Sequence, residues 1–268
     1  MNIKAAYRYQ LDDHKKAIIT YYIILLAIYI LLISSISISV SSTETITYTD
    51  SSSDQISIPV NSTDYNMISG MELATVIFLF IVGLDSFKEV FGMLLQNGIS
   101  RRTLFASRCL TTVSIALIMS VIDKIILLVL KSISLITDEN LLVKSLYEQS
   151  YRNNIEGIGS FLFHIESFIF NILLYLFVIT LGYFIRLVYY RVSKPVRITI
   201  SITIPTVLFI LLPMVDEYVT KGKIYRAFSD FIHFSFGHPL NAIISFAIGA
   251  TFFCSLSWLV IRRVSIKE

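Results

Sequence analysis

The sequence predicts an all-α, polytopic membrane protein with six transmembrane helices in one transmembrane domain, residues 1–268. Three observations carry this prediction. The mean hydropathy is +0.72. Only 15% of the residues are charged, against about 25% in soluble domains. The apolar residues also gather in runs long enough to cross a ~30 Å hydrocarbon core, where helices satisfy their own backbone hydrogen bonds.

Each predicted span is one of these apolar runs. The first is interpreted as an uncleaved anchor, because it is longer than a signal-peptide core and no A-x-A cleavage site follows it. Pro205 and Pro213 interrupt the fifth, which is compatible with a helix that rearranges. The spans cover residues 17–40, 67–84, 104–122, 161–185, 198–214 and 240–261, and the longer outer segments are 41–66, 137–159 and 215–238.

The positive charges predict the orientation. With six spans, both termini lie on the same side, and the segments of that side carry 15 of the 22 Lys and Arg residues. Outer segment 41–66 carries none. Because cytoplasmic loops attract Lys and Arg, the chain is predicted to be N-in and C-in.

A short amphipathic segment joins the second and third spans on the cytoplasmic side. Phe87, Val90, Phe91 and Leu94 recur at helical spacing and form one apolar face. The segment ends at an Asn-Gly pair, which favours a left-handed helix stop. An ordinary helix on the membrane surface would also explain this pattern.

The outer segments differ in character. Segment 41–66 is rich in Ser and Thr and alternates apolar and polar residues, which fits either a small exposed hairpin or a flexible loop. Segment 137–159 predicts a helical turn or two. Phe228, Phe231 and Phe234 in the third segment suit a short re-entrant helix before the last span, although an aromatic belt alone would also explain them.

No catalytic or metal-binding motif is found, so the chain is not expected to be an enzyme. The Gly222-Lys223 pair lacks the other residues of a P-loop, and Ser160 lies in no nucleophile elbow. The four His residues are scattered. Cys109 and Cys254 both fall in apolar runs, which argues against a disulfide framework.

Several ionisable residues lie near the outer ends of spans. Glu72 begins the second span, Asp123 and Lys124 end the third, and Glu166 lies near the start of the fourth. If Glu72, Lys124 and Glu166 surround one cavity, they form the polar rim of a substrate path, with a possible Lys124–Glu166 pair. Snorkelling to the nearby interface is the alternative.

This layout resembles the permease subunits of type-2 ABC exporters, of the bacterial drug and antimicrobial-peptide export type. In that family the second span runs into an acidic residue, a glycine, apolar residues, a Gly/Pro-Ile/Val-Ser-Arg motif and a later basic residue. The residues that match are Glu89, Gly92, Leu94, Leu95, "GISR" at 98–101 and Arg108, and "GHPL" at 237–240 resembles the start of the last span.

The resemblance implies a role for each cytoplasmic piece. The N-terminal residues Ile3, Tyr7 and Leu11 would belong to an interfacial helix. Residues 85–98 would form a coupling helix seated in a groove of a separate ATPase. Arg101 and Arg102 would meet acidic groups or lipid phosphates there. The residues of this expected ATPase-coupling site are Phe87, Val90, Phe91, Leu94, Arg101 and Arg102.

The resemblance also implies the partners and the function. Two copies of an ABC ATPase subunit would bind ATP and Mg²⁺, and this chain would bind no cofactor. A second permease subunit, identical or homologous, would complete an exporter of an amphiphilic peptide, drug or lipid-like molecule in the bacterial cytoplasmic (plasma) membrane. Membrane lipid is an expected partner and nucleic acid is not. The alternative function is an ATP-independent membrane sensor or bacteriocin-immunity protein.

Overall fold

The computed structural model describes residues 3–39, 66–68, 71–85, 93, 96, 98–136, 141–151 and 160–262. Within them the chain is helical apart from two short parallel strands, in which Asn66 pairs with Leu141. Residues 41–65, and with them the predicted hairpin or loop, lie outside the described residues. The elements are α1 (Ile3–Ser39), β1 (Asn66–Ile68), α2 (Met71–Asp85), α4 (Arg101–Ile136), β2 (Leu141–Val143), α5 (Leu146–Tyr151), α6 (Ser160–Arg191), α7 (Lys194–Thr206), η2 (Val207–Leu211), α8 (Leu212–Val215), η3 (Asp216–Thr220), α9 (Lys223–Phe236) and α10 (Pro239–Arg262).

Five helical segments of the described chain are long and apolar enough to cross a membrane. The predicted span 67–84 corresponds to α2, whose 15 residues reach about 22 Å. That is less than the ~30 Å of a hydrocarbon core. A predominantly helical chain with five candidate spans is therefore established, and a sixth span stays a prediction. The five are Ile3–Leu31, Arg101–Ile133, Leu162–Arg191, Lys194–Tyr218 and Pro239–Arg262.

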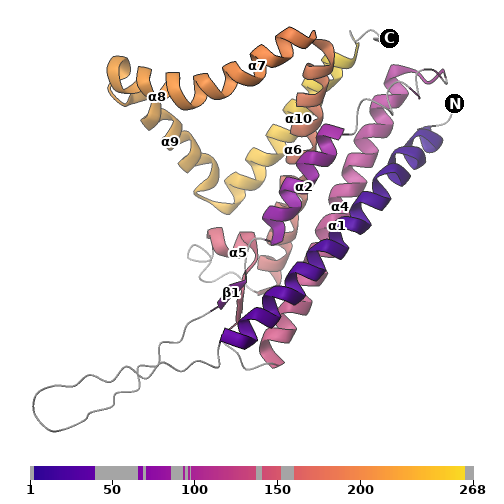
Figure 1. Ribbon diagram of the computed structural model, residues 1–268, viewed down its shortest axis with the longest axis vertical. Helices are drawn as coiled ribbons and strands as arrows, with labels where there is room; N and C mark the ends of the chain where they lie inside the picture. Colours follow the sequence, from indigo (N-terminus) through magenta and orange to yellow (C-terminus); the bar gives the residue numbers. More distant parts are fainter. Residues whose placement is uncertain are drawn as a thin grey trace, which may run out of the picture.

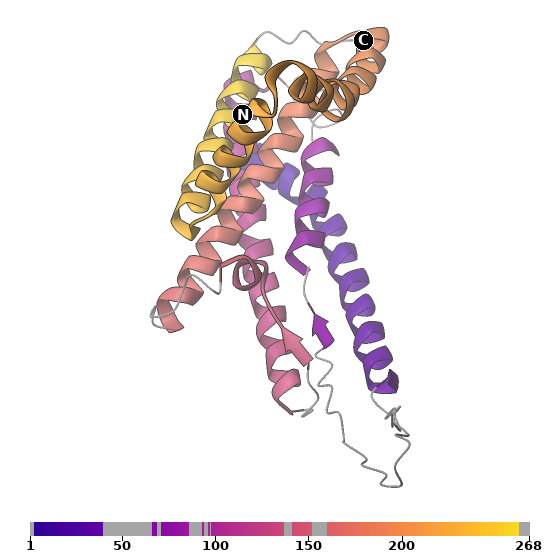
Figure 2. The same cartoon turned by 90° about the vertical axis from the view of Figure 1, so that its left-hand side faces the viewer.

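Helix α6 lies at the centre of the bundle. It packs against α2, α4 and α10, while α1 lies along α4 with both helices running in the same direction (Figure 1). Leu79, Ile115, Met119, Tyr175 and Ile179 are fully buried between these helices. Both chain ends lie toward one end of the bundle, and β1 and α5 lie toward the other (Figures 1 and 2).

Helix α1 differs from the prediction, because the expected interfacial helix is continuous with the first span. Ala6, Gln10 and His14 form a stripe that is buried in the bundle. The amide of Gln10 donates to Ser107 Oγ at 3.0 Å on α4. The polar residues at the start of α1 predicted a helix on the membrane surface. In the structure they pack against a polar face of α4, which buries them and satisfies their hydrogen bonds.

Helix α4 is also longer than the predicted span 104–122, since it continues to Ile136. Leu127 and Leu130 in this extension are buried. Leu130 packs with Leu25 and Tyr29 of α1. The extension is itself apolar, with the run IILLVL at 125–130, and the candidate span continues to Ile133. The predicted span ended too early, at the charged pair Asp123 and Lys124.

The crossing of α2 and α6 depends on two glycines. A Cβ atom on Gly83 would lie 2.6 Å from the carbonyl oxygen of Ile179, and one on Gly182 would lie 2.6 Å from that of Phe80. Neither position has room for a side chain. Small residues that let two backbones approach closely are typical of packed membrane helices.

The segment from α7 to η3 leaves the bundle and α9 returns to it (Figure 1). Residues 201–215 are all exposed. Pro205 cannot donate a backbone hydrogen bond, and the wide π-helical turn η2 follows it. The predicted fifth span is thus helical. Its side chains at 201–215 are exposed rather than packed against the other described helices.

Helix α9 lies where a helix before the last span was predicted, and its re-entrant placement in the membrane stays a prediction. Its aromatic side chains are well exposed, with 61% for Phe228, 64% for Phe231 and 73% for Phe234. Asp216 holds its first turn, because the carboxylate accepts the backbone N–H groups of Ile224 and Tyr225, each at 2.9 Å. Helix α10 then begins within one residue of its predicted start.

Candidate functional site

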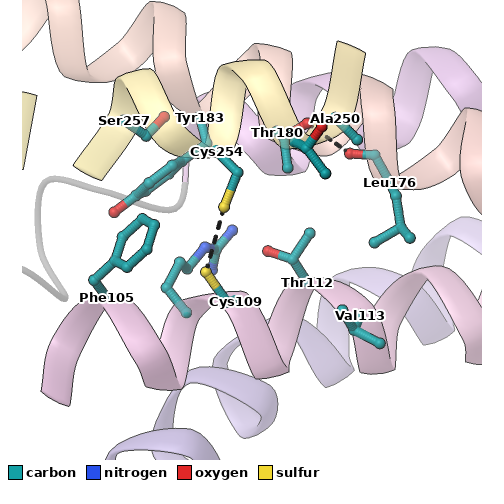
Figure 3. Close-up of a pocket in the computed structure, with 12 residues that line it drawn as sticks. Phe105, Cys109, Thr112, Val113, Leu176, Thr180, Tyr183, Ala250, Cys254 and Ser257 are labelled. Carbon is teal, nitrogen blue, oxygen red and sulfur yellow. Dashed lines mark hydrogen bonds between the residues drawn. The ribbon is translucent and has the colours of Figure 1, made fainter. Parts of the chain in front are cut away.

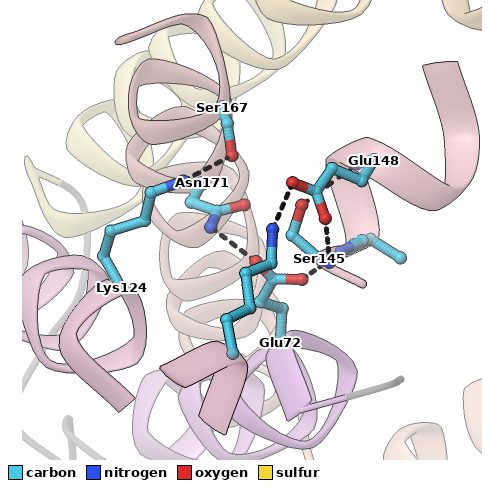
Figure 4. Close-up of polar contacts among 8 residues, drawn as sticks. Glu72, Lys124, Ser145, Glu148, Ser167 and Asn171 are labelled. Atoms are coloured by element: carbon cyan, nitrogen blue, oxygen red, sulfur yellow. Dashed lines mark hydrogen bonds and ion pairs between the residues drawn. The ribbon is translucent and has the colours of Figure 1, made fainter. Parts of the chain in front are cut away.

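Glu72 joins three elements at the end of the bundle that holds β1 and α5. It is only 3% exposed. One carboxylate oxygen accepts the amide of Asn171 on α6 at 2.9 Å, and the other accepts the backbone N–H of Leu146 at the start of α5 (Figure 4). Burial excludes the snorkelling interpretation for Glu72, whose charge-bearing oxygens are satisfied inside the protein.

Lys124 and Glu166 lie at the same end but do not pair. Lys124 Nζ donates to Ser167 Oγ at 3.1 Å, and Glu166 accepts the hydroxyl of Tyr147 at 2.8 Å. Among the described residues no ion pair joins Lys124 to Glu166. The charges of Lys124 and Glu72 attract one another without direct contact. The three predicted residues are thus neighbours with separate partners.

Helix α5 closes this end of the bundle. Burial, reinforced by the bond to Glu166, raises the pKa of the Tyr147 hydroxyl well above its ordinary value, so Tyr147 remains a donor. Lys131 of α4 forms a 2.6 Å ion pair with Glu148 of α5. These contacts fix α5 on the ends of α4 and α6.

Asp123 makes a second buried carboxylate site, at a residue that the sequence analysis noted at the end of a span without assigning it a role. It is 2% exposed, and it accepts the hydroxyl of Tyr22 at 2.9 Å and that of Tyr175. The three residues come from α4, α1 and α6. The signal in the sequence was an aspartate at the end of an apolar run, but its tyrosine partners carried none.

At the opposite end, the "GISR" motif builds the start of α4. Gly98 has φ of 75°, the left-handed conformation predicted for it. Ile99 is buried. Ser100 caps the helix, because its Oγ accepts the backbone N–H of Thr103 at 3.2 Å. The motif therefore acts here as a left-handed turn followed by a helix cap.

The two arginines that follow behave differently. Arg101 Nη1 donates to the carbonyl oxygen of Arg262 at 2.9 Å, which ties the start of α4 to the end of α10. Arg102 is exposed. The other residues of the predicted coupling site, Phe87, Val90, Phe91 and Leu94, lie outside the described residues.

Arg108 is buried two turns further along α4, with 3% exposure. Its Nη1 bonds to His14 Nε2 at 3.0 Å, and its guanidinium carbon lies 5.3 Å from the ring centroid of Tyr183. Because arginine only donates, this nitrogen of His14 must accept and carries no proton. A neutral ring nitrogen and an aromatic face are thus its described partners.

Arg108 also lines a cavity of about 160 Å³ between α4, α6 and α10. The free thiols of Cys109 and Cys254 point toward one another across it, with the sulfur atoms 3.6 Å apart (Figure 3). Thr112 and Thr180 also line it. Within the described part of the chain, no group of three or more His, Cys, Asp or Glu side chains could hold a metal ion.

Comparisons of the chain with protein-family models, with curated proteins and with solved structures gave no match. The class of protein therefore rests on the fold. Five long apolar helical segments, packed around α6 or leaving the bundle exposed, indicate a multi-pass helical membrane protein.

Proposed function

We propose that this chain is the membrane-spanning permease subunit of an ATP-driven exporter in the bacterial cytoplasmic membrane. One observation carries the proposal. The end of α2 and the start of α4 lie at the same end of the bundle as both chain ends (Figure 1). The start of α4 is built from a left-handed Gly98, a capping Ser100 and an Arg101 bonded to α10. This supports a topology in which both chain ends and the proposed docking segment between α2 and α4 lie on the same side of the membrane, the side that the Lys and Arg distribution predicts to be cytoplasmic.

The segment between α2 and α4 is the proposed coupling helix, seated on an ATPase subunit. Helix α4 starts directly after it, and the bond from Arg101 to Arg262 links α4 to α10. A push on the segment would therefore reach two long helices together. Two ATPase subunits and a second permease subunit, identical or homologous, complete the proposed exporter.

The proposed substrate is amphiphilic: a peptide, a drug or a lipid-like molecule. The exposed aromatic side chains of α9 and the exposed segment 201–215 support contact with the bilayer. The hydrogen bonds of Glu72, Lys124 and Glu166 favour a structural role over the lining of a substrate path. The path is proposed to lie between the two permease subunits.

Phe91→Asp tests the coupling role, with Gln96→Asp as the matched control, since Gln96 is exposed in the same segment. A new charge forced into an apolar groove is unfavourable. We expect Phe91→Asp to insert normally but to lose amphiphile-stimulated ATP hydrolysis in membrane vesicles that also contain the ATPase subunit. Gln96→Asp should keep it.

Equal stimulation by Phe91→Asp and the wild type would contradict the coupling role. It would favour the alternative function, an ATP-independent sensor or bacteriocin-immunity protein.

A further inference from the structure

Arg108 carries a buried charge that the described chain does not neutralise. Its Nε and Nη2 atoms have no hydrogen-bond partner among the described residues. Asp13 attracts it only from beyond ion-pair distance. Its bonded partner, the unprotonated nitrogen of His14, adds no negative charge. A buried charge without a counter-charge is strongly unfavourable, so a negative group from outside the described residues is expected.

The cavity beside Arg108 has a second donor of the same kind. The hydroxyl of Ser257, on α10, is buried without a partner among the described residues. The walls are otherwise mostly apolar, and exposed Val113 and Thr251 mark where the cavity reaches the surface between α4 and α10. Two unused donors beside an apolar wall match a molecule with one charged end and one apolar end.

The size of the cavity limits what enters it. A volume of 160 Å³ admits a group on the order of a benzene ring. That is enough for a charged group and the first carbons attached to it. The rest of an acyl chain would leave through the opening between α4 and α10.

We propose that Arg108 and Ser257 bind the anionic headgroup, a phosphate or carboxylate, of an acyl-chain amphiphile. Arg108 lies seven residues after Arg101, which is roughly 10 Å along the helix. In the proposed orientation this is the level where headgroups meet acyl chains in the inner leaflet. Basic pockets between helices on the cytoplasmic side bind anionic lipid headgroups in this way. The site goes beyond the proposed exporter function and rests only on the orientation proposed with it, not on ATPase coupling or transport.

The single tryptophan of the chain reports on this site. Trp258 follows Ser257, and its ring centroid lies 5.1 Å from that of Phe105, which lines the cavity. We would titrate the purified protein in detergent with phosphatidylglycerol that carries brominated acyl chains, and follow quenching of Trp258. Brominated phosphatidylcholine is the zwitterionic control.

We expect saturable quenching by phosphatidylglycerol and at least tenfold weaker binding of phosphatidylcholine. Arg108→Gln should weaken phosphatidylglycerol binding at least tenfold, since it removes charge-assisted hydrogen bonds. Arg8→Gln removes a charge from an exposed position on α1 and should change nothing. Ser257→Ala should weaken binding severalfold and provides the test if Arg108→Gln does not fold.

Two further measurements distinguish a resident lipid from a passing amphiphile as the source of the headgroup. Phosphatidylglycerol that co-purifies with the wild type from membranes, seen by mass spectrometry and lost in Arg108→Gln, supports a resident lipid. Competition by dodecyl phosphate without any co-purified lipid supports a passing amphiphile. The proposal is overturned by absent quenching, by equal quenching with both lipids, or by wild-type binding in each folded variant at Arg108 and Ser257.

Discussion

Polar residues inside the bundle do different things at its two ends. Near α5, Glu72 and Asp123 each accept two hydrogen bonds from different helices, so they fasten elements together. Near the chain ends, Arg108 keeps two unpartnered nitrogen atoms among the described residues. The first pattern is typical of polar groups that stabilise a fold. The second fits the headgroup site proposed at Arg108.

Replacement of Glu72 tests its structural role. Glu72→Ala leaves the amide of Asn171 and the backbone N–H of Leu146 without their acceptor, which should cost about 1–3 kcal/mol. The midpoint of thermal unfolding in detergent should fall by about 2–4 °C for each kcal/mol lost. Glu217→Ala, at an exposed glutamate, is the control and should leave the midpoint unchanged. Equal midpoints for both variants would refute the role.

For single residues, the sequence predicted charged positions inside the bundle but not their hydrogen-bond partners. The presence of charged residues in apolar runs was enough for the hypothesis that Glu72, Lys124 and Glu166 are neighbours. Their partners were not predictable, because Asn171, Ser167 and similar neutral polar residues occur in membrane helices for many reasons. The pairing also depends on contacts between residues far apart in the chain, such as Tyr22 and Asp123.

Among the elements, hydropathy predicted where the helices lie better than where they begin and end, although for the last span both agree. The last span was predicted at 240–261 and α10 covers Pro239–Arg262. Helix α1 begins earlier than predicted because a polar stretch at its start packs on α4. Helix α4 ends later than predicted because its apolar run continues past Asp123 and Lys124. The polar contact of Gln10 with Ser107 is an example that hydropathy cannot reveal.

The close crossing of α2 and α6 predicts that a side chain added at Gly182 destabilises the bundle. A methyl group on Gly182 would meet the backbone carbonyl of Phe80 at 2.6 Å, whereas one on Gly249 would meet the ring of Phe177 at 2.7 Å. A ring can turn aside but a helix backbone cannot. Gly182→Ala should therefore cost about 1–3 kcal/mol, and Gly249→Ala clearly less.

Thermal unfolding of the two variants in the same detergent measures this difference. A loss for Gly249→Ala that equals or exceeds the loss for Gly182→Ala would contradict the close crossing.

The whole molecule combines a packed bundle with an exposed apolar extension. Helices α1, α2, α4, α6 and α10 cover one another, while residues 201–215 and the aromatic side chains of α9 have little cover within the chain. Surface of this kind requires lipid or another subunit around it. Such a surface agrees with the proposal that the chain works beside a second permease subunit.

The partner is the part of the proposal that one measurement decides most directly. We would extract the tagged chain from its native membranes in mild detergent, pull it down and identify the accompanying proteins by mass spectrometry. The proposed function predicts an ABC ATPase subunit in amounts comparable to the chain, present with the wild type and lost with Phe91→Asp. Recovery of the chain alone, or only with copies of itself, would contradict the exporter function.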